Sequence, residues 1–310
     1  MPASQPATTA AAQRAAMVAI VGRANVGKST LINALLGEKV SNVSQVPQTT
    51  RNYIRGVWTE TRGQLVLLDT PGVHRASHDL GRLMNKAART AAAGADIVLL
   101  LLDASERPQI YDQGWMQRLG AVEQPLVIAL NKIDALNPRC DQRATHRHLW
   151  QRSAGAAAAK AHWIEISAKT GQQLSELRNL LFDLAPCGPL LFPAGMLSDF
   201  PRKLLIADIV REKLWQVLKD ELPHACAIQI IDLTESASGW AIRGTILVNK
   251  PSQKGIVIGR RGRQLTQVIR AAERELMEIY DQRISLRLQV RVQAHWAKNT
   301  RLLRQLGYTP

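Results

Sequence analysis

Between Met17 and about Leu184, short apolar runs alternate with longer stretches that have helical spacing. The runs carry few charges, which is typical of strands buried on both faces of a parallel sheet. The stretches STLINALLG (29–37) and DLGRLMNKAARTAAAG (79–94) place apolar residues at helical intervals. We expect an α/β domain with a mostly parallel sheet covered on both faces. Its predicted strands are MVAIVG (17–22), QLVLLDT (64–70), DIVLLLLD (96–103), PLVIALN (125–131) and HWIEIS (162–167).

The pattern changes after residue 201. Residues 202–220 have the spacing of a helix, and residues 226–233 and 240–248 have the composition of strands. The run IVIG (256–259) is strand-like, and a helix is expected from Arg263 to Tyr280. These elements predict a smaller α+β module, a three-stranded sheet with helices on one face.

The third strand of that sheet is ISLRLQVRV (284–292), in which apolar and polar residues alternate. Successive side chains of a strand point to opposite faces, so the polar set is expected to face outward. This set comprises Ser285, Arg287, Gln289 and Arg291.

A linker is expected at residues 186–201, where four prolines and two glycines interrupt both helix and strand. The expected division is a tail at 1–15, a first domain at 16–185 and a second domain at 202–310. The tail lacks the charged and apolar regions of a signal peptide. We expect it to be disordered. The alternative, a transit peptide, would normally carry more basic residues than Arg14 alone.

The 310 residues carry 40 basic and 25 acidic side chains, a formal net charge of +15. Residues 254–310 hold 12 of the basic and only 4 of the acidic residues. A basic excess concentrated in the second domain favours a polyanionic partner. The three cysteines lie far apart, which indicates reduced thiols and a cytoplasmic setting. A metal pair at His74 and His78 is the minority interpretation, since Pro71 and Gly72 indicate a loop there.

The segment GRANVGKST (22–30) matches GxxxxGK[ST] between a predicted strand and a predicted helix. Backbone N–H groups of such a loop surround phosphates, a lysine contacts the β- and γ-phosphates, and a hydroxyl binds Mg²⁺. Lys28 and Ser29 fit these last two roles. The predicted phosphate-binding residues are Gly22, Arg23, Ala24, Asn25, Val26, Gly27, Lys28, Ser29 and Thr30.

Four further segments follow the P-loop in the order found in GTPases of the translation-factor type, which this part of the chain resembles. Asn131, Lys132 and Asp134 resemble the NKxD motif, whose carboxylate accepts two guanine N–H bonds. Ser167, Ala168 and Lys169 resemble the element that supports guanine recognition. Asp69, Thr70, Pro71 and Gly72 resemble DxxG, in which Asp reaches Mg²⁺ through water and the Gly amide contacts the γ-phosphate. In PQTTR (47–51), Thr50 is the expected Mg²⁺ ligand, with Thr49 as the competing choice.

Adding the second domain narrows the resemblance. The segments LMNKAA (83–88), REKL (211–214), ELPHA (221–225) and VIGRRG (257–262) resemble the Era family of bacterial ribosome-assembly GTPases, over about residues 17–308. The resemblance implies a P-loop GTPase domain followed by a KH domain of type II, whose GXXG loop clamps RNA. The implied RNA-binding residues are Lys254, Ile258, Gly259, Arg260, Arg261, Gly262, Arg263, Arg287 and Arg291.

The resemblance further implies GTP/GDP and Mg²⁺ as ligands and the 3′ end of small-subunit (16S) rRNA as the target. It implies a monomer in the cytoplasm, with peripheral membrane association left open. Val73 stands where Ras-like enzymes carry the water-orienting Gln. Asn25 resembles the potassium-binding Asn of related GTPases, so K⁺ is an additional expected ligand. The candidate catalytic residues are Asn25, Lys28, Thr50 and Gly72.

Two rival functions remain. The first is an RNA-binding protein in which GTP is only a structural ligand. The second is a tRNA-modification GTPase, which shares the TTR segment. A basic module at the C-terminal end and the lack of a terminal cysteine disfavour the second rival.

Overall fold

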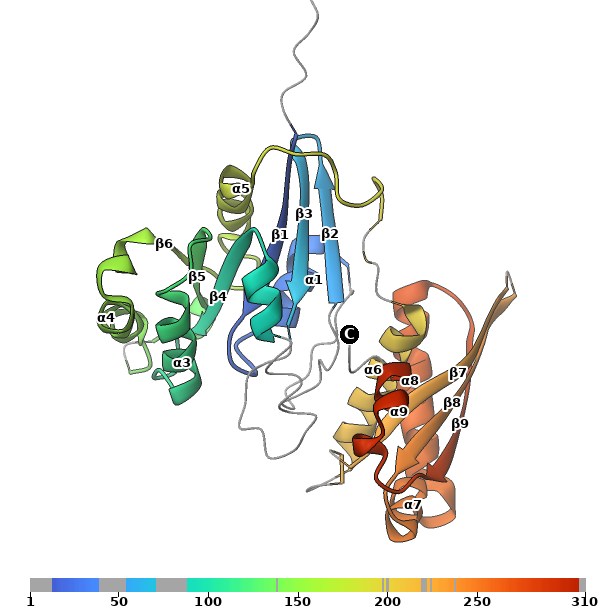
Figure 1. Ribbon diagram of the computed structural model, residues 1–310. Coiled ribbons are helices and arrows are strands. Elements are labelled where there is room, and N and C mark those ends of the chain that lie inside the picture. The colour runs from blue at the N-terminus through green and yellow to red at the C-terminus, as the bar shows by residue number, and fades with distance from the viewer. Residues whose placement is uncertain are drawn as a thin grey trace, which may run out of the picture.

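The structure is a computed structural model that describes residues 13–38, 54–70, 88–137, 139–196, 198, 201–218, 222–223, 225–236 and 238–306. Figure 1 shows two separate lobes, each built on its own sheet. The first sheet has six strands in the order β2-β3-β1-β4-β5-β6, and the second has three in the order β7-β8-β9. The predicted fold class, a mostly parallel α/β domain followed by an α+β domain, is confirmed.

In the first sheet only β2 runs antiparallel to its neighbour β3. The five predicted strands are all present, but β1 begins three residues before the predicted run and includes residues assigned to the tail. The strand β2 was missed. The strands are β1 (Arg14–Val21), β2 (Ile54–Glu60), β3 (Gly63–Asp69), β4 (Ile97–Asp103), β5 (Leu126–Asn131) and β6 (Ala161–Glu165).

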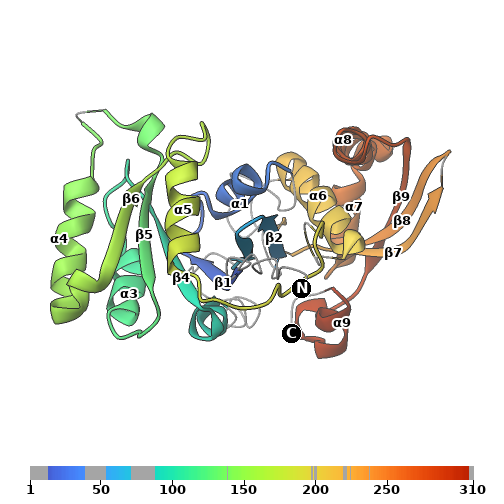
Figure 2. The same ribbon diagram turned by 90° about the horizontal axis from the view of Figure 1, so that it is seen from above.

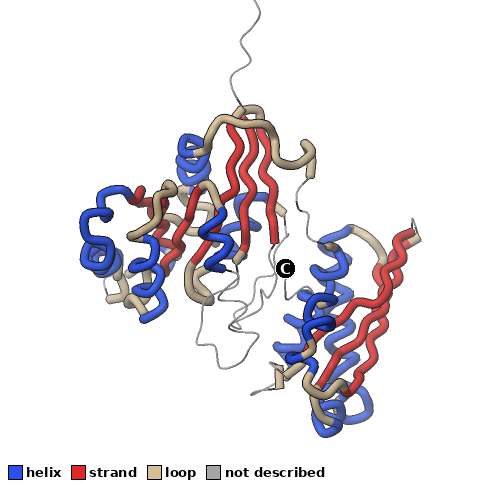
Figure 3. Tube along the Cα trace, in the orientation of Figure 1, coloured by secondary structure: helices blue, strands red, loops and turns tan. Residues whose placement is uncertain are grey.

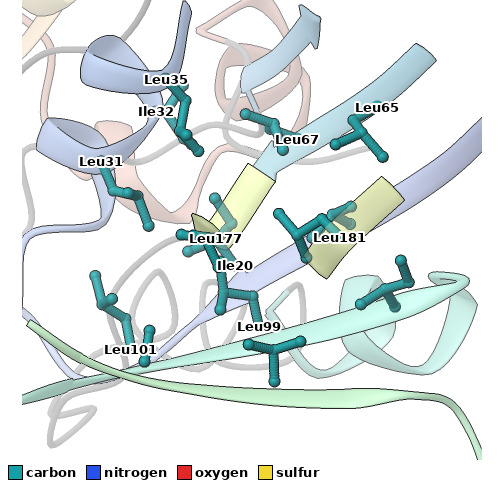
Figure 4. Close-up of a cluster of buried hydrophobic side chains, with 14 of the residues drawn as sticks. Ile20, Leu31, Ile32, Leu35, Leu65, Leu67, Leu99, Leu101, Leu177 and Leu181 are labelled. Carbon is teal, nitrogen blue, oxygen red and sulfur yellow. The ribbon is translucent and has the colours of Figure 1, made fainter. Parts of the chain in front are cut away.

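Helices cover both faces of this sheet, as Figure 2 shows. Alternate residues of the central strands pack on α1 (Lys28–Leu36) and α5 (Leu174–Leu184) on one face. On the other face they pack on residues 88–94, α3 (Ile110–Leu119) and α4 (Arg143–Ala154). Figure 4 shows the first of these two cores, in which Ile20, Leu67 and Leu99 from three strands meet Leu31 and Leu177 from the two helices. Burial on both faces explains why the strands are apolar throughout.

The second domain follows the order helix, two strands, two helices, strand, helix (Figure 3). Strands β7 and β8 are antiparallel, and β8 and β9 are parallel. Among its elements, α6 and α8 pack on one face of the sheet and form the main core. The elements are α6 (Arg202–Val217), β7 (Ala227–Ser236), β8 (Gly239–Val248), α7 (Pro251–Ile258), α8 (Arg263–Tyr280), β9 (Ile284–Val292) and α9 (Thr300–Gln305).

Two predictions for this domain were wrong. Residues 256–258 are the end of helix α7 and not a strand. Helices do not cover only one face, because Leu303 of α9 and the buried Trp296 pack with Ala227 and Leu247 on the opposite face. Within the described residues, no helix is long and apolar enough to cross a membrane.

The segment after α5 is attached to the first domain. Ala15 N donates to Pro186 O at 3.0 Å, and Gly188 N donates to Gln13 O at 2.9 Å. The fully buried Gln64 of β3 accepts from Leu191 N and Phe192 N through Oε1, at 2.9 and 2.8 Å. Its Nε2 donates to Phe192 O at 3.0 Å. The first residues of the predicted linker are therefore held against the end of the first sheet where β1 and β3 begin.

Candidate functional site

The carboxyl ends of the parallel strands β1, β3, β4 and β5 lie at one edge of the first sheet, where open α/β sheets bind ligands. Residues 22–27 connect β1 to α1 at this edge. Gly22 and Gly27 have φ values of +150° and +102°, and Asn25 has φ of +64°. A Cβ on Gly22 would lie 2.5 Å from Leu101 O, so only glycine fits where this loop passes β4. The loop folds as the sequence motif predicts.

Lys28 is the first residue of α1, and its side chain is buried under the loop. Its Nζ donates to Gly22 O at 3.1 Å and to Arg23 O at 2.8 Å. Burial lowers the pKa of Lys28 to about 8, although the nearby carboxylate of Asp69 opposes the shift. Phosphate oxygens would restore the charged form, because anions within reach favour an ammonium.

The Ser29 hydroxyl donates to Asp69 Oδ2 at 2.9 Å, and Asp69 is fully buried at the end of β3. A hydroxyl and a carboxylate that converge beside a phosphate loop are the oxygen ligands that Mg²⁺ prefers. These residues therefore fit the predicted metal. Thr70 is also buried, and its hydroxyl donates to Ile20 O at 2.7 Å, which ties the end of β3 to β1.

The predicted base-reading residues meet at the ends of β5 and β6. Asn131 Nδ2 donates to Val26 O at 2.7 Å, and its Oδ1 accepts from Ala168 N at 2.9 Å. This one amide therefore joins the P-loop to the SAK segment. Ser167 Oγ donates to Asp134 Oδ1 at 2.6 Å, which orients the carboxylate expected to accept the guanine N–H bonds. Lys169 is exposed beside this site.

A charge cluster under the P-loop, buried except for Glu106, was not predicted from the sequence. Arg23 is 8% exposed, and its guanidinium lies 2.5 Å from Glu106 Oε2 and 3.3 Å from Asp112 Oδ2. Burial raises the pKa of Asp112, against the opposing effects of the Gln109 N–H bond and the Arg23 charge. Asp103, which ends β4, binds Lys132 Nζ at 2.6 Å. The available signal was a carboxylate ending the apolar run DIVLLLLD.

Several predicted residues lie outside the described part of the chain. They are Thr49, Thr50, Pro71, Gly72, Val73, His74 and His78. In the described ranges, no group of three or more His, Cys, Asp or Glu side chains is arranged to hold a metal ion. Of the residues expected to bind Mg²⁺ directly or through water, Ser29 and Asp69 lie within those ranges.

In the second domain, the GRRG segment joins two helices, α7 and α8. Gly259, Arg261 and Gly262 have φ of +73°, +54° and +76°. A Cβ on Gly259 would lie 2.8 Å from Gln264 Cβ, whereas a Cβ on Gly262 would meet nothing within 4 Å. Gly259 is thus required by the turn itself. At Gly262 the backbone is open on the side where a ligand can approach.

Basic side chains surround this loop. Lys254, Arg260, Arg261 and Arg263 are exposed, and Ile258 is half-buried against the core. Arg287 and Arg291 are exposed on β9, the edge strand on which α7 packs. Their neighbours Leu286 and Val290 point into the core under α8, so the two arginines lie on the opposite face of the sheet. The predicted residues thus form two basic surfaces, one around the GRRG loop and one on the face of β9 that points away from α8.

Comparison with known proteins places both halves of the chain. The family of 50S ribosome-binding GTPases matches residues 17–132, and the KH domain family matches residues 221–297. GTPase Era of Geobacter sp. (strain M21) is 38% identical over 298 residues, which covers 95% of this chain and 98% of the relative. GTPase Era of Clostridium botulinum (strain Hall) is 38% identical over 299 residues, with the same coverage. The chain belongs to the Era family of GTPases.

Two solved Era structures share the fold. Era in complex with MgGDPNP and nucleotides 1506–1542 of 16S ribosomal RNA superposes with a TM-score of 0.85 at 32% identity. A single-residue variant of Aquifex aeolicus Era bound to GDP·AlF4⁻ gives a TM-score of 0.86, also at 32% identity. Both comparisons cover 96% of this chain and 100% of the solved chain. The family resemblance drawn from the motifs is confirmed.

Proposed function

We propose that the chain is a GTP-hydrolysing switch that binds the 3′ end of 16S rRNA through its KH domain during assembly of the small ribosomal subunit. The observation that supports this proposal is that one chain holds both a P-loop joined to the SAK segment and an open GRRG turn. The Asn131 amide assembles the first site from the P-loop and the SAK segment. The open GRRG turn between α7 and α8 forms the second. The solved Era complex with MgGDPNP and an rRNA fragment supports the same pairing.

In the nucleotide site, the Lys28 ammonium and the N–H groups of residues 22–29 would hold the β- and γ-phosphates. Ser29 and Thr50 would bind Mg²⁺, with Thr49 as the alternative, and Asp69 would reach the ion through water. Mg²⁺, when bound, neutralises charge on the phosphate oxygens. Asp134 would accept the guanine N–H bonds, and Asn25 would bring K⁺ to the phosphates. Without a Gln to orient water, turnover should be on the order of 10⁻⁴–10⁻² per second.

In the RNA site, the backbone at Gly262 would approach a phosphate, and Arg260 and Arg261 would neutralise charge without reading sequence. Arg261 adopts a left-handed conformation that non-glycine residues rarely take. Backbone held in such a conformation is typical of ligand-binding loops. The RNA strand would then continue along the edge formed by α7 and β9.

Coupling between the sites is proposed to pass through the switch segments, residues 38–52 and 72–82. Strand β2 begins two residues after the first segment, and Gly56 of β2 forms an isolated β-bridge with Ser198 before the KH domain. A change of the first segment on GTP binding would therefore be transmitted to the connection between the domains.

The decisive test measures both activities on one preparation. Phosphate release under multiple turnover should occur with GTP and not with ATP. Fluorescence anisotropy should detect binding of a single-stranded RNA with the 3′-terminal 16S sequence. Gly262→Asp should abolish RNA binding and leave GDP affinity unchanged, because it adds bulk and a like charge only at the turn. Absence of turnover would leave GTP as a structural ligand, and RNA binding by Gly262→Asp would move the RNA site elsewhere.

Crosslinking the protein to RNA in cells, followed by sequencing, identifies the target and separates rRNA from tRNA. We also propose a cytoplasmic location and a monomeric state, tested by fractionation and light scattering. A substantial membrane fraction that survives removal of ribosomes would show peripheral membrane association.

A further inference from the structure

The carboxylate of Asp103 lies between the two loops of the nucleotide site. It ends strand β4 and is 1% exposed. Its Oδ1 accepts from Ser105 N at 3.0 Å and from Ser105 Oγ at 2.7 Å, which fixes the orientation of the group. Its Oδ2 then lies 2.6 Å from Lys132 Nζ. Asp103 is therefore a fixed anchor for the lysine of the base-reading loop.

The base-reading loop is held at each of its three polar side chains. Asn131 bonds to Val26 and Ala168, Asp134 accepts from Ser167, and Lys132 pairs with Asp103. The partners of Asn131 and Asp134 belong to segments that touch the nucleotide in this family. The partner of Lys132 belongs to none of those segments, so its effect on the nucleotide can only be indirect.

Lys132 needs an anchor more than the other two. A lysine side chain has a flexible four-carbon stem, and ordering it when the ligand arrives weakens binding. The backbone of Lys132 has φ of +68°, and its side chain is 35% exposed. The ion pair to the buried carboxylate orders the stem before a ligand binds, between the carboxyl ends of β4 and β5.

The anchor is also linked to the P-loop. Asp103 Oδ2 lies 3.8 Å from the Arg23 guanidinium, whose closer partners are Glu106 and Asp112. Burial alone would raise the pKa of Asp103, but hydrogen bonds from Lys132 and Ser105 outweigh it and hold the pKa below its usual value. The carboxylate is therefore charged at neutral pH and faces two cations, one from each loop.

We propose that Asp103 is a positioning residue for guanine nucleotides, which holds the Lys132 side chain so that its stem forms a preordered surface for the base. The proposal rests on the proposed function, since it requires that the site binds GTP and GDP. It predicts that Asp103 affects how tightly the base is held and not how fast the phosphate is cleaved, because its closest partners are Ser105 and Lys132.

The test variant is Asp103→Asn, which keeps the size of the side chain and an acceptor for Ser105 but removes the charge. Loss of an ion pair to a buried carboxylate corresponds to roughly a tenfold change in affinity. We expect the KM for GTP and the Kd for GDP to rise roughly tenfold, while kcat stays within about twofold. A purely structural role would instead lower the concentration of active protein and reduce kcat at unchanged KM.

The matched control is Asp96→Asn, just before the start of the same strand. Asp96 Oδ2 accepts from Met17 N at 2.8 Å. Asp96 and Asp103 lie at opposite ends of β4, so the control lies away from the nucleotide loops. The control should bind GDP like wild type, and thermal unfolding of both variants checks that they fold.

A double-mutant cycle with Lys132→Met shows whether Asp103 acts through Lys132. The double variant should bind GDP no more weakly than Lys132→Met alone. If the loss of GDP affinity in the double variant were the product of the losses in the two single variants, Asp103 would act by another route and the proposal would be overturned. Since Lys132 is partly exposed, Lys132→Met also probes the contact if Asp103→Asn fails to fold. Wild-type protein that binds no GDP would refute the proposed function, whereas wild-type-like affinity in Asp103→Asn would refute this inference alone.

Discussion

The buried ammonium of Lys28 should make nucleotide affinity depend on pH. Desolvation lowers the pKa of this group to about 8, with Asp69 raising it and Arg23 lowering it further. In the complex, phosphate anions favour the charged form, so the pKa returns toward its ordinary value of 10.5 or above. Between these two values, the complex holds one proton more than the free protein.

At pH values below about 8, Lys28 is charged both before and after binding, and affinity does not change with pH. Above that value the free protein carries a neutral amine, and binding must take up a proton from solution. Affinity should then fall by up to about tenfold per pH unit, so that GDP binds about tenfold more weakly at pH 9 than at pH 7.

The same shift affects stability in the opposite direction. The folded, nucleotide-free protein loses the Lys28 proton at a lower pH than the unfolded chain. The free energy of unfolding from this group should therefore rise with pH between about 8 and 10.5. A difference in unfolding free energy between wild type and Lys28→Arg that falls across this interval would contradict the assigned burial of Lys28.

Titration calorimetry with GDP across this pH range, in buffers of different ionisation enthalpy, measures affinity and proton uptake together. Uptake should approach about one proton at pH 9 and vanish at pH 7. Lys28→Arg is the control, because arginine stays charged and the ring titration of guanine is common to both proteins. Equal affinity at both pH values, with no proton uptake by wild type, would refute the reasoning.

Three further predictions address the same site. Asn131→Ala should lower the unfolding free energy by about 2 kcal/mol, because two buried backbone groups lose their partner; urea denaturation showing no change would contradict this. Asp134→Asn should shift preference from GTP to XTP, since an amide leaves one guanine donor unmatched at roughly 1–3 kcal/mol; competition binding with both nucleotides decides it. Hydrolysis should be faster in K⁺ than in Na⁺, and Asn25→Ala should remove the difference; equal phosphate release by wild type in both salts would reject the potassium site and favour an arginine supplied by a partner.

The strands of the first domain were predictable because their burial leaves a continuous signal. Each central strand is apolar on both faces, so no knowledge of its neighbours is needed to recognise it. Strand β2 was missed because IRGVWTE mixes polar residues and a glycine with its apolar positions. It is an antiparallel edge strand, and such a strand needs an apolar pattern on one face only. The pairing with β3, which is nonlocal information, identifies it.

Helix α7 was mistaken for a strand for a local reason. It is eight residues long, contains Gly255 and ends in the β-branched run IVI. The helical signal was at its start, where Pro251 takes the first helical turn and Gln253 Oε1 accepts from Asn249 N and Lys250 N. The glycines of the GRRG segment both have positive φ in the structure. Its function as a helix–helix turn depends on α7, so its geometry could not follow from the loop alone.

The charge cluster under the P-loop could not be predicted from the sequence motif. The motif predicts what the backbone of residues 22–29 does, but it says nothing of the Arg23 side chain. The partners Asp112 and Glu106 are more than 80 residues away in sequence and come from α3 and the loop before it. Charge pairs of this kind leave no periodic pattern, so only the folded chain reveals them.

The composition of the linker predicts a domain boundary but not the contacts that the linker makes with the first domain. Prolines and glycines predict that residues 186–201 are neither helix nor strand, and residues 186–196 lie in no helix or strand of the structure. The side chain of Gln64 nevertheless holds this segment at Leu191 and Phe192 through three hydrogen bonds, and Ser198 pairs with Gly56 of β2. The connection is thus fastened to the two strands on either side of the turn at residues 61–62. Of those strands, β2 follows the first switch segment and β3 ends in Asp69. The strands that make these contacts therefore connect the nucleotide site to the segment before the KH domain, which supports the proposed coupling.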